Sequence, residues 1–166
     1  MFKMYKDKEP NKNYKITKKE KLEDIIKIVK VGKWFPLFWG GCIASACFCF
    51  TFVYKKWWDE TDDIRKKTTL IHELHHCKQQ KKQWLFWHLI YIFSWRQRLN
   101  YEVDAYALSI KVIKDNTPNW TQRHLEREVD WMARTLASIA YLWTGSYEKN
   151  YKKIMNAYLT TYEGKK

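Results

Sequence analysis

The chain has 166 residues and a net formal charge of +13, and 46 % of its residues are hydrophobic. A chain of this length forms one domain with a core of ordinary size, which excludes a fold that needs metal ions or disulfide bonds merely to be stable. Its four cysteines include no C-x-x-C pair, which excludes the disulfide framework of small secreted domains. The excess of lysine favours contact with nucleic acid, acidic lipid or an acidic protein, although it equally serves solubility.

The N-terminal segment is expected to be a basic arm followed by a helix. Residues 1–16 are polar and rich in lysine, and they do not have the composition of a secretory signal peptide. Thr17 and Glu20 match a capping box at the start of a helix. The apolar residues that follow at helical spacing are Leu22, Ile25, Ile26 and Val29. We therefore predict a polar arm over 1–16, a helix over about 18–31 and a single domain over 17–166.

An uncharged stretch over residues 34–54 has two interpretations. It is long enough to cross a bilayer, but Pro36 and the Gly40-Gly41 pair interrupt it. From Cys47 to Tyr54, aromatic and smaller side chains alternate, which is typical of a strand with two different faces. We favour strand-like segments around a turn at Gly40-Gly41 and keep a membrane span as the less favoured alternative.

The middle of the chain is expected to contain a helix and then a short apolar block. Asp59, Thr61 and Asp62 can each cap a helix that continues to about Lys82. The apolar block at 84–95 is too short to cross a bilayer. It is compatible with a buried helix, a re-entrant segment or an interfacial anchor, and its length favours a place in the core.

Three further helices are predicted in the C-terminal half. The first covers about 98–114 and stops at Asn116-Thr117-Pro118. The second begins after Asn119 or Thr121 and ends near Gly145. Ser146 can cap the last. The apolar stripes of the last two helices are Leu125, Val129, Met132, Leu136 and Ile139, and Tyr151, Ile154, Met155 and Tyr158.

The pattern HExxH stands within residues 72–76, HELHH. His72 and His76 are four residues apart, so on a helix both imidazoles project from one side and can bind the same zinc ion. Glu73 is not placed to bind beside them, but it can take a proton from the water that the metal activates. His75 lies off this line and is expected to face solvent or to contact a ligand. Two histidine ligands require a third ligand and an open coordination position.

Glu102 is the best candidate for that third ligand. It follows His76 by 26 residues and lies in the segment NYEVDAY of a separate predicted helix. With this segment the sequence resembles the gluzincins, zinc metallopeptidases whose third ligand is a glutamate on the helix after HExxH. The CKQQ tail of the motif and the aromatic block after it are similar to short HExxH proteins of tailed bacteriophages. The resemblance covers about residues 45–115.

The resemblance implies a fold and a set of roles. His72, His76 and Glu102 would be the zinc ligands and Glu73 the general base. The fold would be α+β and mainly helical, zincin-like, with a small β-hairpin or sheet packed on the HExxH helix and the Glu102 helix, and with further C-terminal helices. In this family a strand before the HExxH helix pairs with extended substrate, and the strand from Cys47 to Tyr54 is either that edge or an ordinary core strand.

The chain departs from the gluzincin pattern at Tyr106. Many members have an aspartate there, four residues after the ligand glutamate, which orients a zinc-bound histidine. Asp104 is an alternative partner, although it points to a different side of a helix. We expect Tyr106 to act instead as a donor to the developing oxyanion. The rival donors for that role are His88, Tyr101 and Arg96.

Three functions compete at this point. The first is a zinc-dependent peptidase that acts on peptide or protein substrates. The second is a virion-associated or structural protein that keeps the zinc site without catalysis and contacts other virion subunits. The third is a membrane-bound peptidase, which requires that residues 34–54, alone or together with residues 84–95, enter lipid. The expected location is a bacteriophage virion or the host cytoplasm, and the net charge leaves contact with nucleic acid or an acidic surface open.

Overall fold

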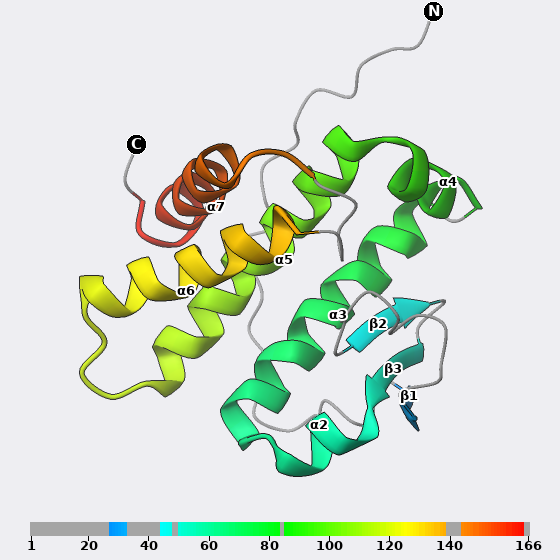
Figure 1. Cartoon of the computed structure of the whole chain (residues 1–166), viewed down its shortest axis with the longest axis horizontal. Helices are drawn as coiled ribbons and strands as arrows, with labels where there is room; N and C mark the ends of the chain where they lie inside the picture. The colour runs from blue at the N-terminus through cyan, green and yellow to red at the C-terminus, as the bar shows by residue number, and fades with distance from the viewer. Residues whose placement is uncertain (1–26, 33–43, 48–49, 84, 139–143, 165–166) are drawn as a thin grey trace, which may run out of the picture.

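The computed structural model describes residues 27–32, 44–47, 50–83, 85–138 and 144–164. Within these ranges the chain is mainly helical with one small sheet, as predicted (Figure 1). The strands are β1 (Lys27–Val31), β2 (Ala44–Cys47) and β3 (Phe50–Tyr54). The helices are α2 (Lys55–Glu60), α3 (Asp63–Gln83), α4 (Leu85–Phe93), α5 (Trp95–Asn116), α6 (Gln122–Leu136) and α7 (Tyr147–Tyr162). The basic arm over 1–16, the capping box at Thr17 and the turn at Gly40-Gly41 lie outside the described residues.

The sheet has the strand order β1-β3-β2, with β3 in the centre. Strand β1 runs parallel to β3, and β2 runs antiparallel to it with Ala46 opposite Thr51. The alternation along β3 is real, because Thr51 and Val53 are fully buried whereas Phe50 is 40 % exposed. However, Cys47 belongs to β2, so the single strand predicted from Cys47 to Tyr54 is wrong. Because β3 has a neighbour on each side, it is a core strand and not a free edge.

The helix predicted over 18–31 is wrong for residues 27–31, which form β1. Ile28, Val29 and Val31 are β-branched residues, which pack well on a pleated surface. In the strand, the backbone groups of this segment form hydrogen bonds with β3. In a helix, they would have to bond to one another. The non-local partner therefore overrides the helical spacing seen in the sequence. Residues 18–26 lie outside the described part of the chain.

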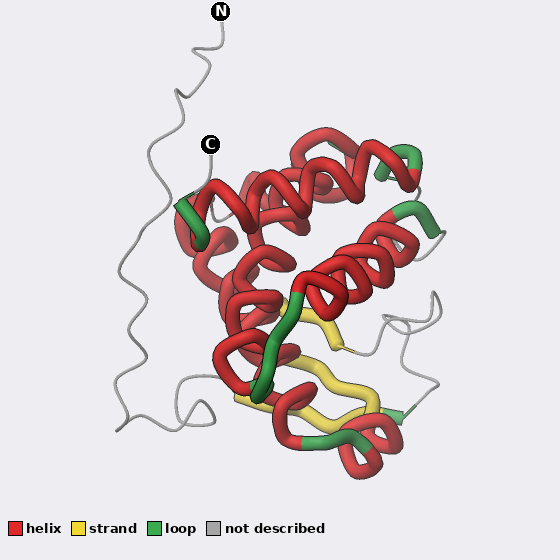
Figure 2. Tube along the Cα trace, turned by 90° about the vertical axis from the view of Figure 1, so that its left-hand side faces the viewer, coloured by secondary structure: helices red, strands yellow, loops and turns green. Residues whose placement is uncertain are grey.

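Helices α3 and α5 form the centre of the molecule, and the sheet packs against α3 (Figures 1 and 2). Of the three caps that the sequence offered, Asp62 precedes α3, and its carboxylate accepts the backbone N–H of Arg65 at 2.9 Å, whereas Asp59 lies within α2. Helix α5 begins three residues earlier than expected, since Ser94 accepts the backbone N–H of Gln97 at 3.4 Å. It ends at Asn116, followed by Thr117, as the sequence indicates. The two helices that carry the motif and Glu102 therefore lie against each other.

Helices α6 and α7 pack on α5 and complete the main core. The predicted apolar stripe of α6 is buried from Leu125 to Leu136. The helix was expected to continue to Gly145, but it ends at Leu136. There the backbone N–H and the hydroxyl of Thr144 both donate to the Leu136 carbonyl, at 3.3 and 2.8 Å. The returning chain thus supplies partners for a helix end, which replaces further helical bonds.

Helix α4 occupies the apolar block for which a core position was favoured. That expectation is wrong, because Phe86, Leu89, Ile92 and Phe93 are between 52 % and 81 % exposed. Among the described elements, its main contacts are with α3 and α5, which lie against only part of its surface. Among the described residues, no helix combines the length and apolar character needed to cross a membrane.

Candidate metal centre

Two buried histidines and one buried glutamate meet where α3 crosses α5. Nε2 of His72 lies 3.1 Å from Nε2 of His76. The carboxylate of Glu102 reaches both rings, at 3.4 Å from Nε2 of His72 and 3.3 Å from Nε2 of His76. These three side chains form a group of donor atoms that could hold a metal ion. The structure therefore brings together the three residues that the sequence proposed as ligands.

The hydrogen bonds of Gln79 and Ser109 determine which ring nitrogens carry protons. The Gln79 amide donates to the Tyr101 carbonyl at 3.3 Å, so its oxygen faces Nδ1 of His76 and accepts from it at 2.9 Å. The Ser109 hydroxyl donates to the Ala105 carbonyl at 2.9 Å, so its oxygen lone pair faces Nδ1 of His72 at 3.4 Å. In neutral imidazoles with protons on Nδ1, both Nε2 atoms present lone pairs.

The Glu102 side chain faces the two histidines from α5 and is also held by a hydrogen bond. Its side chain is buried, and one of its oxygens accepts the hydroxyl of Tyr91 on α4 at 2.6 Å. Its second oxygen, Oε2, has no hydrogen-bond partner among the described residues. Burial opposes the charge on Glu102, but the nearby His76 and His72 outweigh burial and hold the pKa of the carboxyl well below its usual range. A charged, partly unsatisfied carboxylate therefore faces the two Nε2 atoms.

The electrostatics of the cluster favour a bound cation. Burial alone disfavours a charged imidazole, yet the Glu102 carboxylate overcomes it and raises the pKa of His76 to about 9. Such a site attracts a proton or a metal ion into the space between the three donors. His75 behaves differently, because burial and the neighbouring His76 and His72 lower its pKa to about 3. His75 therefore stays neutral and outside the group of three ligands.

Glu73 lies next to the cluster and is also buried. Burial raises the pKa of its carboxyl above the usual value, although His72 and His76 act in the opposite direction. The backbone N–H of Ala46 in β2 hydrogen-bonds to this carboxylate. The carbonyl of the same residue accepts the Gln80 amide of α3 at 3.0 Å. These two bonds turn the outer edge of β2 towards α3, so the edge strand at this site is β2 and not the strand that the sequence indicated.

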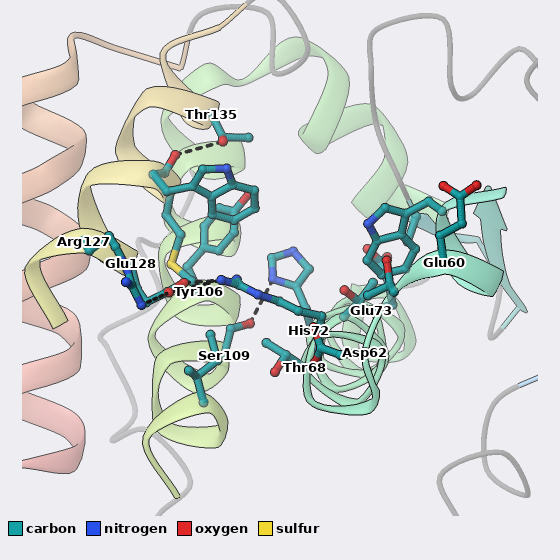
Figure 3. A pocket seen from close by; sticks show the side chains of 18 residues that line it. Glu60, Asp62, Thr68, His72, Glu73, Tyr106, Ser109, Arg127, Glu128 and Thr135 are labelled. Atoms are coloured by element: carbon teal, nitrogen blue, oxygen red, sulfur yellow. Dashed lines mark hydrogen bonds and ion pairs between the residues drawn. The ribbon is translucent and has the colours of Figure 1, made fainter. Parts of the chain in front are cut away.

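A cavity of about 900 Å³ opens onto the site (Figure 3). His72 and Glu73 line it, together with Tyr106 and Ser109 of α5. Its far wall is α6, where Glu128 pairs with Arg65 of α3. His76 and Glu102 are not among its lining residues. The cavity therefore reaches the cluster from the His72 and Glu73 side.

Among the candidate donors, the structure brings Tyr106 to the site. Its side chain is buried, its ring centroid lies 4.7 Å from that of His72, and it lines the cavity.

Arg96 is exposed and stacks over Trp95 instead. Tyr101 contributes its carbonyl to Gln79 and does not line the cavity. Asp104 is exposed, on a different side of α5 from Glu102.

Two remaining residues complete the comparison with the sequence. Cys77, the residue that follows His76, is buried. The side chain of His88, the last rival donor, lies outside the described part of the structure.

Three residues that support the ligands escaped the sequence-based prediction of the site. Gln79 follows His76 by three residues and Ser109 follows Glu102 by seven, so helical spacing offered a signal for both. Tyr91 offered none, because its position depends on how α4 packs against α5. Searches with this chain match no family model, no curated protein and no solved structure.

Proposed function

We propose that this protein is a zinc-dependent peptidase with the ligand set of the gluzincins and a zincin-like arrangement of strand and helices. The observation that carries the proposal is the geometry of the three donors. In a tetrahedral zinc site with bonds of about 2.0–2.1 Å, two ligand atoms are separated by about 3.3–3.4 Å. Here the two Nε2 atoms are 3.1 Å apart, and the Glu102 carboxylate lies at similar distances from them, with Oε1 3.3 Å from His76 Nε2 and Oε2 3.4 Å from His72 Nε2.

The chemistry of the donors supports zinc as the metal. Two neutral imidazoles and one carboxylate form the His₂Glu set used by catalytic zinc sites that keep a fourth position open. The Nδ1 bonds of His72 and His76 hold both rings with Nε2 directed at the metal position, as outer partners of zinc ligands usually do. The cavity beside His72 offers room at the fourth position.

Glu73 is the residue we propose as general base. Zinc, when bound, supplies Lewis-acid activation of water and polarisation of a substrate carbonyl. Glu73 lies beside the ligands, and the pKa raised by its burial makes it a better proton acceptor than an exposed glutamate. Tyr106 is proposed as the donor to the oxyanion, since its buried side chain lines the same cavity.

The proposed substrate is an extended peptide that lies along β2. The outward N–H and carbonyl of Ala46 bond to Glu73 and Gln80 of α3, so this residue marks the outer side of β2 and is not itself available to pair with substrate. By the period of two along a strand, Ala44 directs its backbone groups the same way, and Ala44 lines the cavity. A substrate strand added there would pass Glu73 and His72.

The test uses a substitution that keeps the metal and removes the base. Glu73→Gln is expected to retain one zinc per chain by metal analysis and to lower peptide hydrolysis by about a thousandfold or more, because the neutral amide cannot take the proton. His72→Ala is expected to lose both zinc and activity. Tyr106→Phe is the matched variant for the donor role, with zinc retained and kcat reduced.

The alternative is a structural or virion-associated protein in which zinc only holds α3 against α5. It predicts that Glu73→Gln changes neither zinc content nor assembly and that the native protein cleaves no peptide library. A native protein that binds no zinc under metal-replete conditions would overturn both proposals.

A further inference from the structure

The exposed large apolar side chains of the described residues are concentrated on the short helix α4 and at the start of α5. Eight such residues are exposed, and five of them fall between positions 86 and 95. The five are Phe86 at 66 %, Leu89 at 52 %, Ile92 at 55 %, Phe93 at 81 % and Trp95 at 40 %. Single exposed apolar residues are ordinary on a soluble protein, but a contiguous group marks an interaction surface.

The apolar residues of α4 share one face of the helix. At about 100° per residue, Phe86, Leu89, Ile92 and Phe93 fall within an arc of about 120°. Tyr91 lies on the opposite face, where its hydroxyl donates to Glu102 at 2.6 Å. The helix is thus oriented by a hydrogen bond to Glu102 of the candidate metal centre, and its apolar face is turned away from the protein.

The C-terminal end of α4 is also fixed. The buried guanidinium of Arg98 donates to the carbonyl of Tyr91 at 2.9 Å and to that of Ile92 at 3.3 Å. These bonds satisfy carbonyls that a helix end leaves without partners. Because both the end and one side of α4 are bonded to α5, its outward face is a defined part of the fold.

Basic residues flank α4 along the chain at both of its ends. From residue 74 to residue 101 the chain contains no aspartate or glutamate. Lys81 and Lys82 are exposed just before α4, and Arg96 is exposed just after it. The ammonium group of Lys149 on α7 lies 4.5 Å from the centre of the Trp95 ring. The surface therefore combines an apolar centre with cationic margins and a tryptophan at one end.

We propose that α4 docks this protein onto an anionic lipid surface, with the helix lying in the plane of the interface. A short helix with an exposed apolar and aromatic face and basic residues beyond its ends is suited to the boundary between headgroups and acyl chains. With nine residues, α4 is about 13.5 Å long and cannot cross the bilayer. The proposal concerns the opposite face of α4 from the metal cluster and does not depend on catalysis.

Two other occupants fit the surface less well. A second copy of the chain in a symmetric dimer would place Lys81, Lys82 and Arg96 of both copies around one interface, where like charges repel. Protein partners in general bury surfaces that are depleted in lysine. Anionic lipid instead provides an apolar layer beneath a layer of negative charge, which matches both parts of the surface.

The test measures co-sedimentation of the full zinc-loaded chain with two kinds of vesicle. One kind is phosphatidylcholine alone, and the other is an equal mixture of phosphatidylcholine and phosphatidylglycerol. We expect the chain to bind the mixed vesicles at low salt. Its binding to the neutral vesicles should be at least about tenfold weaker. The variant Phe86→Gln/Phe93→Gln is expected to bind the mixed vesicles at least about tenfold more weakly. Lys81→Gln/Lys82→Gln should weaken binding by a similar factor.

The control is Ile64→Gln, which removes an exposed apolar side chain, 37 % accessible, from the first turn of α3. It should bind the mixed vesicles as the unaltered chain does. All variants should keep the helical circular dichroism spectrum, since the substituted side chains are exposed. The proposal would be overturned if the double phenylalanine variant bound as well as the unaltered chain, or if the unaltered chain did not bind. It would also be overturned if the unaltered chain were a dimer that this variant converts to a monomer.

Discussion

His72 and His76 are distinguished from ordinary buried histidines by what holds their Nδ1 atoms. Ser109 and Gln79 occupy those atoms, at 3.4 and 2.9 Å, and leave both Nε2 atoms directed at Glu102. The hydrogen bond that His76 Nδ1 donates to Gln79 is the shorter of the two. The bond from the Gln79 amide to the Tyr101 carbonyl fixes the orientation of that amide. Removal of the Gln79 side-chain amide is therefore expected to affect the proposed metal site more than removal of the Ser109 hydroxyl.

Gln79→Leu tests this role at the scale of one residue. The substitution removes the acceptor for His76 Nδ1 and is expected to weaken zinc binding by about 10–100-fold, because the ring loses its preferred tautomer and orientation. Competition with a chromophoric chelator measures the affinity. Gln79→Glu keeps an acceptor at the same place and should restore most of it. Equal zinc affinity in Gln79→Leu and the unaltered protein would show that the bond does not support the ligand.

At the scale of elements, α3 is joined to α6 across the cavity by one ion pair. Both terminal nitrogens of Arg65 donate to the carboxylate of Glu128, at 3.1 and 3.2 Å. The Glu128 side chain is only 4 % exposed, whereas that of Arg65 is 45 % exposed. Such a pair matters chiefly because losing one member leaves the other charge buried without compensation. The spacing of α3 and α6, and with it the shape of the cavity, depends on this contact.

Arg65→Leu is expected to lower the free energy of unfolding by about 2–4 kcal/mol, since it leaves the buried Glu128 carboxylate with only the exposed Arg127, 3.7 Å away, as a charged partner. Urea denaturation of the purified protein measures the change. The control is Arg127→Leu, because Arg127 is 69 % exposed and lies 3.7 Å from the same carboxylate. Its cost should remain below about 1 kcal/mol. If the double variant Arg65→Leu/Glu128→Leu is no more stable than Arg65→Leu, unpaired charge is not the cause.

At the scale of the whole molecule, the core formed by α5, α6 and α7 contains a polar group that titrates only in alkali. Tyr158 is almost fully buried, and its hydroxyl donates to Glu163 at 2.6 Å. Burial and the neighbouring carboxylate raise the pKa of Tyr158 above its usual range. Since the unfolded chain releases this proton near pH 10 and the folded chain only at higher pH, alkali favours unfolding.

The contribution of Tyr158 to stability is therefore complete below about pH 10 and decreases as the pH rises towards its pKa in the folded protein. Urea unfolding measured at a series of pH values from neutral to strongly alkaline should show this decrease. Tyr158→Phe should lose about 1 kcal/mol at neutral pH, where the hydrogen bond is intact, and should decrease less steeply in alkali. An unchanged alkaline slope in Tyr158→Phe would assign the decrease to other groups.

The sequence by itself was sufficient wherever the determining interactions are local. The spacing of His72 and His76 and the cap at Asp62 predict a helix with two imidazoles on one side, and the structure has that helix. The stop after Asn116 and the cap at Ser146 are likewise local and correct. The placement of Glu102 is different in kind, since the resemblance suggested it and the tertiary packing of α5 on α3 brings its carboxylate to His76.

Tertiary structure decided what depends on distant partners. Residues 27–31 form a strand because β3 offers backbone hydrogen bonds, although their apolar spacing suits a helix. Residues 50–54 form a central strand because β1 and β2 flank them, which moves the edge at the site to β2. Helix α4 exposes its apolar face because Tyr91 and Arg98 bind its other side to α5. Local spacing records which side chains share a face, whereas only the assembled chain determines what that face meets.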